Sequence, residues 1–452
     1  MSSPANNIPG YKRIIRLGLP ILVGQLGMIA VGFADTIMVG QYSTVSLASA
    51  AFVNNLFNLA IFGLLGFAYG LTPLVGALFS GNHQRRIGAL VRNGVAINIA
   101  VALLITLIMG IVYLNLDSLG QPEELLPVIR PYYLIYLSGL VPVALFNVLA
   151  QWSYGIRNTA MPMWITLGSN LVNVFGNWLL IYGNLGCPEM GLTGAGISTL
   201  VSRALCCLAI ICVFLFSSRY REYREGFVKS RLDSRSCGVV ARTSWPVALQ
   251  MMFETGAFSG SAVMAGWLGS ISLAAFQVIV TISTLGFCIY YSMASAVSVL
   301  VANSAGLNDG RAMRIIAFRG YRVILCLTAL SSLVFIFGLK GMVWLFTDDP
   351  IVAVSAMTLL VPLLTYQLGD ATQINFVNAL RGTANVMPLL WIAFVCYILV
   401  GLPSTYLFAF TFGLGLKGIV FSFSVSLFLA GALFFFYFMR TTRRYISPDS
   451  RS

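Results

Sequence analysis

Three carboxylates stand inside long apolar stretches of this 452-residue chain, where they are well suited to bind an ion. Of the fourteen acidic residues, only Asp35, Glu254 and Asp370 lie well inside such stretches. An ionisable group inside a membrane costs at least ~2.5 kcal/mol to insert, so each of the three is a functional-site hypothesis. A carboxylate in such surroundings suits a hard cation such as Na⁺, or a proton.

Glu254 and Asp370 fall at a similar depth when positions are counted from the nearest basic loops. Glu254 follows Arg242 by nearly the same distance in the sequence as that by which Asp370 precedes Arg381, and each helical residue adds about 1.5 Å. The two acids are therefore expected to share one cation, with both as Na⁺ ligands. Tyr366, one turn before Asp370, either donates a hydrogen bond to that acid or only packs.

A second group of oxygen-bearing side chains is expected around Asp35, a further candidate Na⁺ ligand. Counted from the charges of the basic loops, Asp35 lies 19 residues beyond Arg16, Asn177 lies 20 beyond Arg157, and Thr199 lies 20 before Arg219. Asn173 lies one turn from Asn177 on the same helical face. Carboxylate, amide and hydroxyl oxygens together suit a hard cation or a proton. These four residues predict a coupling-ion site nearer the outer surface.

Blander roles for the same residues are compatible with the sequence. The asparagines could be polar packing residues between membrane helices, and Thr199 could bond to its own backbone. The acids could instead be neutralised in buried pairs with Arg203 or Arg130.

The sequence offers little for catalysis. The one histidine, His83, stands in a polar turn, which excludes HExxH and other histidine-based sites. Six of the eight cysteines lie in apolar runs and no CxxC occurs, so neither disulfides nor zinc are indicated. No Walker motif is present, so ATP is not the direct energy source. We expect no enzyme and no cofactor, only a coupling ion, Na⁺ or H⁺.

Composition indicates which elements position these residues. Hydrophobic residues make up 58% of the chain and charged residues 9%, and the mean hydropathy is +0.87; soluble proteins are about a quarter charged. The chain is therefore expected to be an all-α integral membrane protein. A membrane helix takes roughly 20 apolar residues. Apolar runs predict twelve transmembrane helices, at 14–40, 46–79, 87–115, 124–153, 160–183, 191–217, 239–266, 272–305, 312–338, 350–379, 387–412 and 416–440.

Basic residues gather on one set of loops, and the opposite loops are neutral or acidic. The positive-inside rule therefore places both termini and the basic stretch between the sixth and seventh helices in the cytoplasm. The formal net charge of +13 is thus a topology signal, and no nucleic-acid partner is expected. The predicted domains are an N-terminal lobe at 1–216, a cytoplasmic linker at 217–238, a C-terminal lobe at 239–440 and a cytoplasmic tail at 441–452.

The two six-helix lobes carry an internal repeat. The shift that places Pro20 on Pro246, called the repeat offset below, also aligns Asn82 with Asn308, and Met161–Pro162 with Met387–Pro388. Because each lobe has an even number of helices, the two share one topology and are expected to be related by a pseudo-two-fold axis along the membrane normal. The acids are not repeated, since Glu254 falls at the position of Met28.

Several motifs give the chain a resemblance to multidrug and toxic compound extrusion (MATE) transporters over nearly its whole length. They are FADTIMVG at 33–40, PLVGALFSGNHQRR at 73–86, YGIRNTAMPM at 154–163 and NVFGNW at 173–178. The pairing of Glu254 with Asp370 resembles the NorM-type branch. The resemblance implies a V-shaped pair of bundles in a bacterial cytoplasmic (inner) membrane. It implies functional roles at Asp35, Asn173, Asn177 and Thr199 in the first lobe, and at Glu254, Tyr366 and Asp370 in the second.

The activity that the resemblance implies is export of cationic or amphipathic drugs in exchange for Na⁺ or H⁺ by alternating access, by a protein expected to be a monomer. A lipid-linked oligosaccharide flippase of related architecture is the alternative, although its cavity should be rich in arginine. A membrane scaffold or a membrane-embedded enzyme is a further alternative, and the buried acids speak against a scaffold. Leu399 and Pro403 replace Asn173 and Asn177 in the second lobe, so the two lobes are not expected to bind the same thing.

Overall fold

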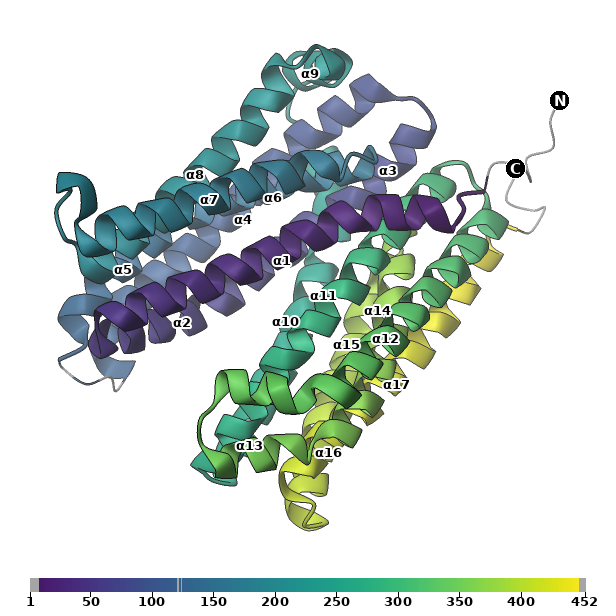
Figure 1. The fold of residues 1–452 in the computed structure, drawn as a ribbon. Coiled ribbons are helices and arrows are strands. Elements are labelled where there is room, and N and C mark those ends of the chain that lie inside the picture. The colour runs from purple at the N-terminus through teal and green to yellow at the C-terminus, as the bar shows by residue number, and fades with distance from the viewer. Residues whose placement is uncertain (1–7, 120–121, 123, 447–452) are drawn as a thin grey trace. The chain divides into compact units, whose positions relative to one another are not determined.

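The computed structural model describes residues 8–119, 122 and 124–446, and every regular element among them is helical (Figure 1). Helices satisfy their own backbone hydrogen bonds, which a membrane core requires. The elements are α1 (Tyr11–Tyr42), α2 (Thr44–Tyr69), α3 (Leu71–Ser80), α4 (Gln84–Leu114), η2 (Leu116–Leu119), α5 (Leu126–Ser138), α6 (Leu140–Gly155), α7 (Ala160–Tyr182), η3 (Asn184–Gly186), α8 (Gly191–Phe216), η4 (Ser218–Tyr220), α9 (Arg221–Lys229), α10 (Ser234–Trp267), α11 (Ser270–Gly306), α12 (Gly310–Phe346), α13 (Pro350–Met357), α14 (Leu360–Gly382), α15 (Met387–Ala393), η5 (Phe394–Gly401), α16 (Leu402–Tyr406), η6 (Leu407–Thr411) and α17 (Gly415–Arg443).

All twelve segments predicted to cross the membrane are helical. Within the described residues, nine segments are long and apolar enough to span a bilayer, and α13 with α14, bent by 50°, forms a tenth. The other two predicted segments, α7 and α10, are long helices with more polar residues. These two helices carry Asn173, Asn177 and Glu254, which are among the polar residues that lower their hydropathy.

The helices form two compact units. The C unit comprises the chain up to Leu22 together with the part from Leu249 onward, and the N unit spans Val23–Ala248. Both boundaries fall inside helices, α1 and α10, so each of these helices begins in one unit and ends in the other. The two boundaries are themselves equivalent under the repeat offset. The predicted lobes, 1–216 and 239–440, follow the repeat in the sequence, whereas the units follow packing.

Glycines allow close packing where these exchanged helix ends meet their neighbours. In the N unit, a Cβ added to Gly70 would lie 2.4 Å from the Oγ of Ser244 on α10. In the C unit, a Cβ added to Gly18 on α1 would lie 2.7 Å from the Sδ of Met293. Gly18 and Ser244 are equivalent under the repeat offset, so the same position of the repeat makes the close crossing in both units.

Helix boundaries follow the repeat. The starts of α2 and α11, at Thr44 and Ser270, are equivalent under the repeat offset, as are the starts of α4 and α12. The turns before α4 and α12 use the same backbone conformation, with φ of 56° at Asn82 and 54° at Asn308. Asparagine tolerates this left-handed conformation better than most residues, which explains why it occurs in both copies.

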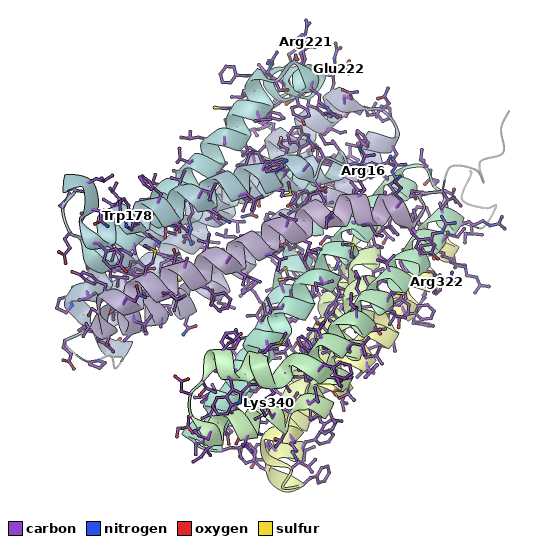
Figure 2. All side chains as sticks on the ribbon, in the orientation of Figure 1. Arg16, Trp178, Arg221, Glu222, Arg322 and Lys340 are labelled. Atoms are coloured by element: carbon purple, nitrogen blue, oxygen red, sulfur yellow. The ribbon has the colours of Figure 1, made fainter. Side chains whose placement is uncertain are left out.

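The basic linker is folded onto the N unit. Its helix α9 packs against the start of α4, where a Cβ on Gly88 would lie 1.9 Å from the carbonyl oxygen of Tyr223. Arg92 of α4 donates to carbonyl groups at the C-terminal end of α9. Figure 2 shows Arg221 and Glu222 projecting outward from α9, where both are exposed. One face of the linker helix therefore packs closely against α4 at Gly88, and the charged Arg221 and Glu222 are exposed on another face.

Candidate functional site

In the N unit, the four predicted residues lie together on three helices. Asn177 of α7 donates from Nδ2 to a carboxylate oxygen of Asp35 on α1. Asn173, one turn away on α7, donates from Nδ2 to Thr199 Oγ1 on α8 at 3.3 Å. Ser198 Oγ donates to the backbone carbonyl of Asn173 at 2.7 Å and so joins α8 to α7.

The two asparagines leave their amide oxygens unused. Asn173 and Asn177 are 3% and 0% exposed, and the Oδ1 atom of each is buried without a hydrogen-bond donor among the described residues. Their Nδ2 groups are committed to Thr199 and Asp35, which fixes both amides with the oxygens turned elsewhere. Buried acceptors without donors are costly unless a cation or a proton donor meets them. The N unit therefore presents an oxygen-lined site of the kind that hard cations use.

Among the described residues, neither arginine proposed as a partner of Asp35 forms an ion pair with its carboxylate. Arg130 pairs instead with Asp117, with 2.8 Å between Nη2 and Oδ1. The guanidinium of Arg203 stacks over the ring of Tyr136, 4.1 Å from its centroid. Among the residues the structure describes, no ion pair joins Asp35 to either arginine.

In the C unit, Glu254 belongs to a chain of polar contacts between α10 and α14. Gln250, one turn before Glu254, donates from Nε2 to its carboxylate at 2.8 Å. The amide oxygen of Gln250 accepts from Arg381 Nη2 at 3.1 Å, and Arg381 Nη1 donates to Asn378 at 3.3 Å. Gln250 and Arg381 are 1% and 5% exposed. Gln250 therefore connects a carboxylate to a buried cation through two hydrogen bonds.

Asp370 lies in the middle of α14 and is 3% exposed. Within the described part of the chain, its carboxylate has no hydrogen bond and no ion pair. Tyr366 does not hydrogen-bond to it in this structure. The ring of Tyr366 instead packs with Phe258 and Phe423, at centroid distances of 6.3 Å and 5.9 Å. Asp370 is thus the least compensated acid of the three.

Sequence reasoning missed several polar residues of the C unit. Arg381 was interpreted as a loop charge and used to measure depth, which is wrong because it is buried in the last turn of α14. Gln373 and Tyr397 are also buried, and Gln373 Nε2 donates to the Tyr397 hydroxyl at 2.7 Å. The spacing of Gln250 and Glu254, one turn apart on one helix, was a signal that could have found the first of these contacts.

No group of three or more His, Cys, Asp or Glu side chains in the described residues is arranged to hold a metal ion. A cation here would be held by one or two carboxylates completed by amide and hydroxyl oxygens. Na⁺ binding at Asp35, Glu254 and Asp370 stays a prediction.

Sequence relatives cover nearly the whole chain. The MatE family model matches residues 20–179 and 246–407, two stretches whose starts are equivalent under the repeat offset. A probable multidrug resistance protein NorM of Xanthomonas axonopodis pv. citri is 27% identical over 450 residues, 98% of each chain. Another protein of that description, from Geobacillus kaustophilus, is 29% identical over 394 residues, 87% of each chain.

Solved structures share the fold. A MOP superfamily transporter from Pyrococcus furiosus superposes with a TM-score of 0.88 at 17% identity, covering 97% of this chain and 98% of its own; the reverse polarity of its binding pocket is described as suggesting a different function. A MATE transporter of Vibrio cholerae gives a TM-score of 0.86 at 16% identity, with the same coverage. The predicted all-α membrane fold is confirmed. Since the family match covers most of its length, the chain belongs to the MatE family of multi-pass membrane transporters, which are not enzymes.

Proposed function

We propose that the protein is a secondary antiporter that exports cationic or amphipathic drugs in exchange for Na⁺ or H⁺. The observation that carries this proposal is Asp370, a buried carboxylate without a compensating partner among the described residues. Such a group is stable only when a cation, a proton or a cationic ligand neutralises it. Relatives named as multidrug resistance proteins support the substrate class.

Charge in the C unit favours a single monovalent ligand. Glu254 and Asp370 supply two negative charges, and Arg381, connected to Glu254 through Gln250, supplies one positive charge. When both acids are ionised, the three side chains sum to one negative charge, which one Na⁺, one proton or one organic cation balances. Coupling ion and drug therefore compete for the same charge.

Aromatic rings stand one turn from each acid. Phe258 follows Glu254 by one turn, and Tyr366 precedes Asp370 by one turn. Both rings meet Phe423 of α17, with Phe258 and Phe423 at 4.6 Å between centroids. Carboxylates beside aromatic faces suit flat organic cations, through charge attraction and cation–π contact. The same acids disfavour the pyrophosphate of a lipid-linked oligosaccharide, so the flippase alternative is the weaker one.

In the proposed cycle, loading from outside neutralises the carboxylates and the drug leaves outward. A carboxylate that is neutral in one state and charged in the other biases a two-state protein, and this gives ion and drug a reciprocal effect on each other's binding. In the N unit, the oxygens of Asp35, Asn173 and Asn177 provide a second place for the coupling ion. The basic loops are proposed to face the cytoplasm of a bacterial inner membrane, with both termini inside.

Efflux of ethidium from proteoliposomes containing the purified protein tests this function. One set of vesicles carries an inward Na⁺ gradient alone and a second carries an inward proton gradient alone. Efflux that requires one of the two gradients is expected and identifies the coupling ion. Efflux in neither set, from protein that is correctly folded and inserted, would contradict antiport.

A further inference from the structure

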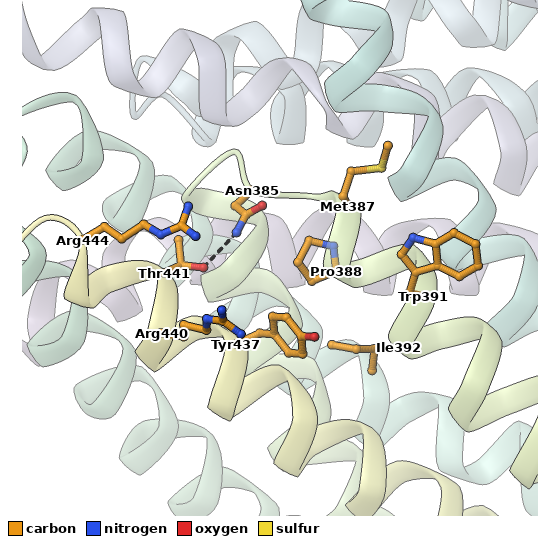
Figure 3. A pocket seen from close by; sticks show the side chains of 9 residues that line it. All are labelled: Asn385, Met387, Pro388, Trp391, Ile392, Tyr437, Arg440, Thr441 and Arg444. Atoms are coloured by element: carbon orange, nitrogen blue, oxygen red, sulfur yellow. Dashed lines mark hydrogen bonds between the residues drawn. The ribbon is translucent and has the colours of Figure 1, made fainter.

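A pocket of about 370 Å³ lies in the C unit between the start of α15 and the end of α17 (Figure 3). One wall carries Met387, Trp391 and Ile392 of α15, and the other carries Arg440 and Arg444 at the end of α17. This volume is within the range of small-molecule sites, about 300–1,000 Å³. None of the acids assigned to transport lines it, so the pocket is separate from the proposed drug and ion sites.

The pocket lies at the level where the membrane meets water. Two membrane-spanning segments end there, because one begins at Met387 and the other finishes at Arg443. Trp391 is 63% exposed, which is the usual situation of tryptophan at the interface between lipid tails and head groups. The apolar wall therefore faces lipid and the basic wall faces head groups.

Two arginines line the polar end of this pocket. Arg440 and Arg444 are one turn apart at the end of α17 and lie on one face of the helix. Both are exposed, and neither side chain makes an ion pair or a hydrogen bond with any residue the structure describes. Among the residues that the structure describes, none of those lining the pocket is acidic. The site is therefore positively charged and unneutralised by its own lining.

Between the two walls lies a fixed polar floor. Asn385 donates from Nδ2 to the hydroxyl of Thr441 at 2.9 Å, the contact drawn in Figure 3. This bond holds the loop before α15 against α17 and orients the Asn385 side chain at the polar end of the pocket. The polar end thus combines two guanidinium groups with an amide, and the other end is apolar.

We propose that this pocket binds an anionic phospholipid of the leaflet that faces the basic loops. Arg440 and Arg444 hold the phosphodiester, since guanidinium groups bind phosphate oxygens in a two-pronged geometry. Met387, Trp391 and Ile392 pack along the first part of an acyl chain. A free phosphate would use the arginines but leave this apolar wall unused, so the lipid is the occupant that satisfies both halves.

Native mass spectrometry of the full-length protein in detergent tests the assignment. The protein is titrated in parallel with dioleoylphosphatidylglycerol, with dioleoylphosphatidylcholine and with inorganic phosphate. The charge-removing variants are Arg440→Gln and Arg444→Gln. Arg311→Gln is the matched control, because Arg311 is an exposed arginine at the start of α12 that does not line the pocket. Trp391→Ala removes part of the apolar wall.

Phosphatidylglycerol is expected to bind more tightly than phosphatidylcholine. Each arginine substitution should weaken phosphatidylglycerol binding about fivefold, the effect of one basic residue at a membrane surface, while Arg311→Gln should leave it unchanged. Trp391→Ala should weaken both lipids. Equal binding of the two lipids, the same loss in Arg311→Gln, or displacement of the lipid by millimolar phosphate would each overturn the proposal.

Discussion

In the N unit a single acid, Asp35, is surrounded by neutral oxygen-bearing side chains, whereas in the C unit two acids, Glu254 and Asp370, share the interior with a buried arginine. The repeat offset relates the scaffolds but not these groups. Asp35 corresponds to Ser261, and Asp370 corresponds to Ala144. The repeat thus preserves helix ends and crossings, while each unit has acquired its own charges.

The helix that carries the asparagines in the N unit has changed geometry in the C unit. α7 is a regular α-helix, whereas its counterpart runs through two π-helical segments, η5 and η6. Pro403 stands where α7 has Asn177, and proline has no N–H and clashes with the carbonyl one turn earlier. Tyr397, in the first π-helical segment, accepts the hydrogen bond from Gln373. The position that holds a predicted ion ligand in the N unit thus holds a proline in the C unit, on a helix with a different geometry.

The largest expected effect separates the acids of the two units. Asp370→Asn is expected to abolish drug efflux from cells, with unchanged protein in the membrane, because the neutral amide keeps the shape but not the charge. Asp35→Asn is expected to reduce ion-driven efflux at least ~10-fold (about 1.4 kcal/mol) while leaving drug binding intact.

Ethidium resistance, membrane abundance and ethidium binding to the purified variants are the measurements. Asp348→Asn, an acid in the loop before α13, is the control and should behave as wild type. Retained resistance in both Asp370→Asn and Glu254→Gln would contradict the different roles assigned to the acids of the two units. Loss of ethidium binding in Asp35→Asn would contradict them as well.

The next effect compares the N-terminal ends of α4 and α12. Gly88→Ala should cost about 3 kcal/mol, at the upper end of overpacking, because its Cβ would lie 1.9 Å from a backbone oxygen of α9. Gly310→Ala should cost less, since its nearest atom, the carbonyl oxygen of Thr442, is 2.6 Å away. Gly110→Ala, with open space around it on α4, is the control. Thermal unfolding in detergent ranks the stabilities of the three variants. A Gly88→Ala variant that unfolds at the same temperature as the wild type would contradict the close packing.

Removing the connection between acid and arginine tests the polar chain of the C unit. Gln250→Leu takes one partner from Glu254 and one from Arg381. Hydrogen bonds to charged groups contribute about 1.5–3 kcal/mol, so a loss of about 2 kcal/mol is expected. The control is Gln277→Leu, at an exposed position of α11. The free energy of unfolding of both variants is measured with a chemical denaturant. Equal values for Gln250→Leu and Gln277→Leu would show that Gln250 does not stabilise the protein by connecting Glu254 to Arg381.

A smaller effect is expected in the N unit, where Thr199→Val removes the acceptor of the Asn173 amide. A neutral hydrogen bond contributes about 1 kcal/mol, which corresponds to roughly fivefold in ion affinity. Thr36→Val, next to Asp35 in the chain, is the control because the Thr36 hydroxyl donates to the backbone carbonyl of Gly32 on its own helix. The half-saturating Na⁺ concentration or the pH midpoint of efflux is the readout. A shift in Thr36→Val as large as that in Thr199→Val would count against the oxygen cluster.

The smallest expected effect is that of low pH on the packing of the linker. The hydrogen bond from Arg221 and the charge of Arg85 lower the pKa of Glu225 below its ordinary value. A lowered folded-state pKa stabilises the docked linker above the unfolded pKa of about 4.3, and this stabilisation is lost as pH falls through the folded value. Proteolysis of the linker should therefore rise below about pH 4.3 in the wild type. Glu225→Gln should remove that pH dependence, and an unaltered profile would contradict it.

Much of the fold was predictable because a membrane-spanning helix can be recognised from its long run of apolar residues. The twelve helical segments and the repeat follow from apolar runs and from matched residues such as Asn82 and Asn308. The exchange of helix ends inside α1 and α10 was not predictable, since hydropathy does not record which bundle a helix face packs against. The π-helical turns near Pro403 were also missed, because a proline alone does not specify how the chain relieves its clash.

The two sites differed in predictability for a related reason. In the N unit, depth counting brought Asp35 near Asn177, and Asn173 near Thr199, because all lie on regular helices. In the C unit, Arg381 sits at a helix end, and only its contact with Gln250, far away in the sequence, shows that it is buried. Long-range partners of this kind leave no local pattern in the sequence.

The passage of the chain between units inside α1 and α10 has a consequence for cutting the protein in two. A cut in the linker between α9 and α10 would leave each fragment with a first helix whose initial turns belong to the other fragment's unit. Each fragment would then lack the helix start that packs in its own unit and would carry one that packs in the other unit. A cut inside the linker therefore does not separate the two packed units, because one helix start of each unit stays on the other fragment.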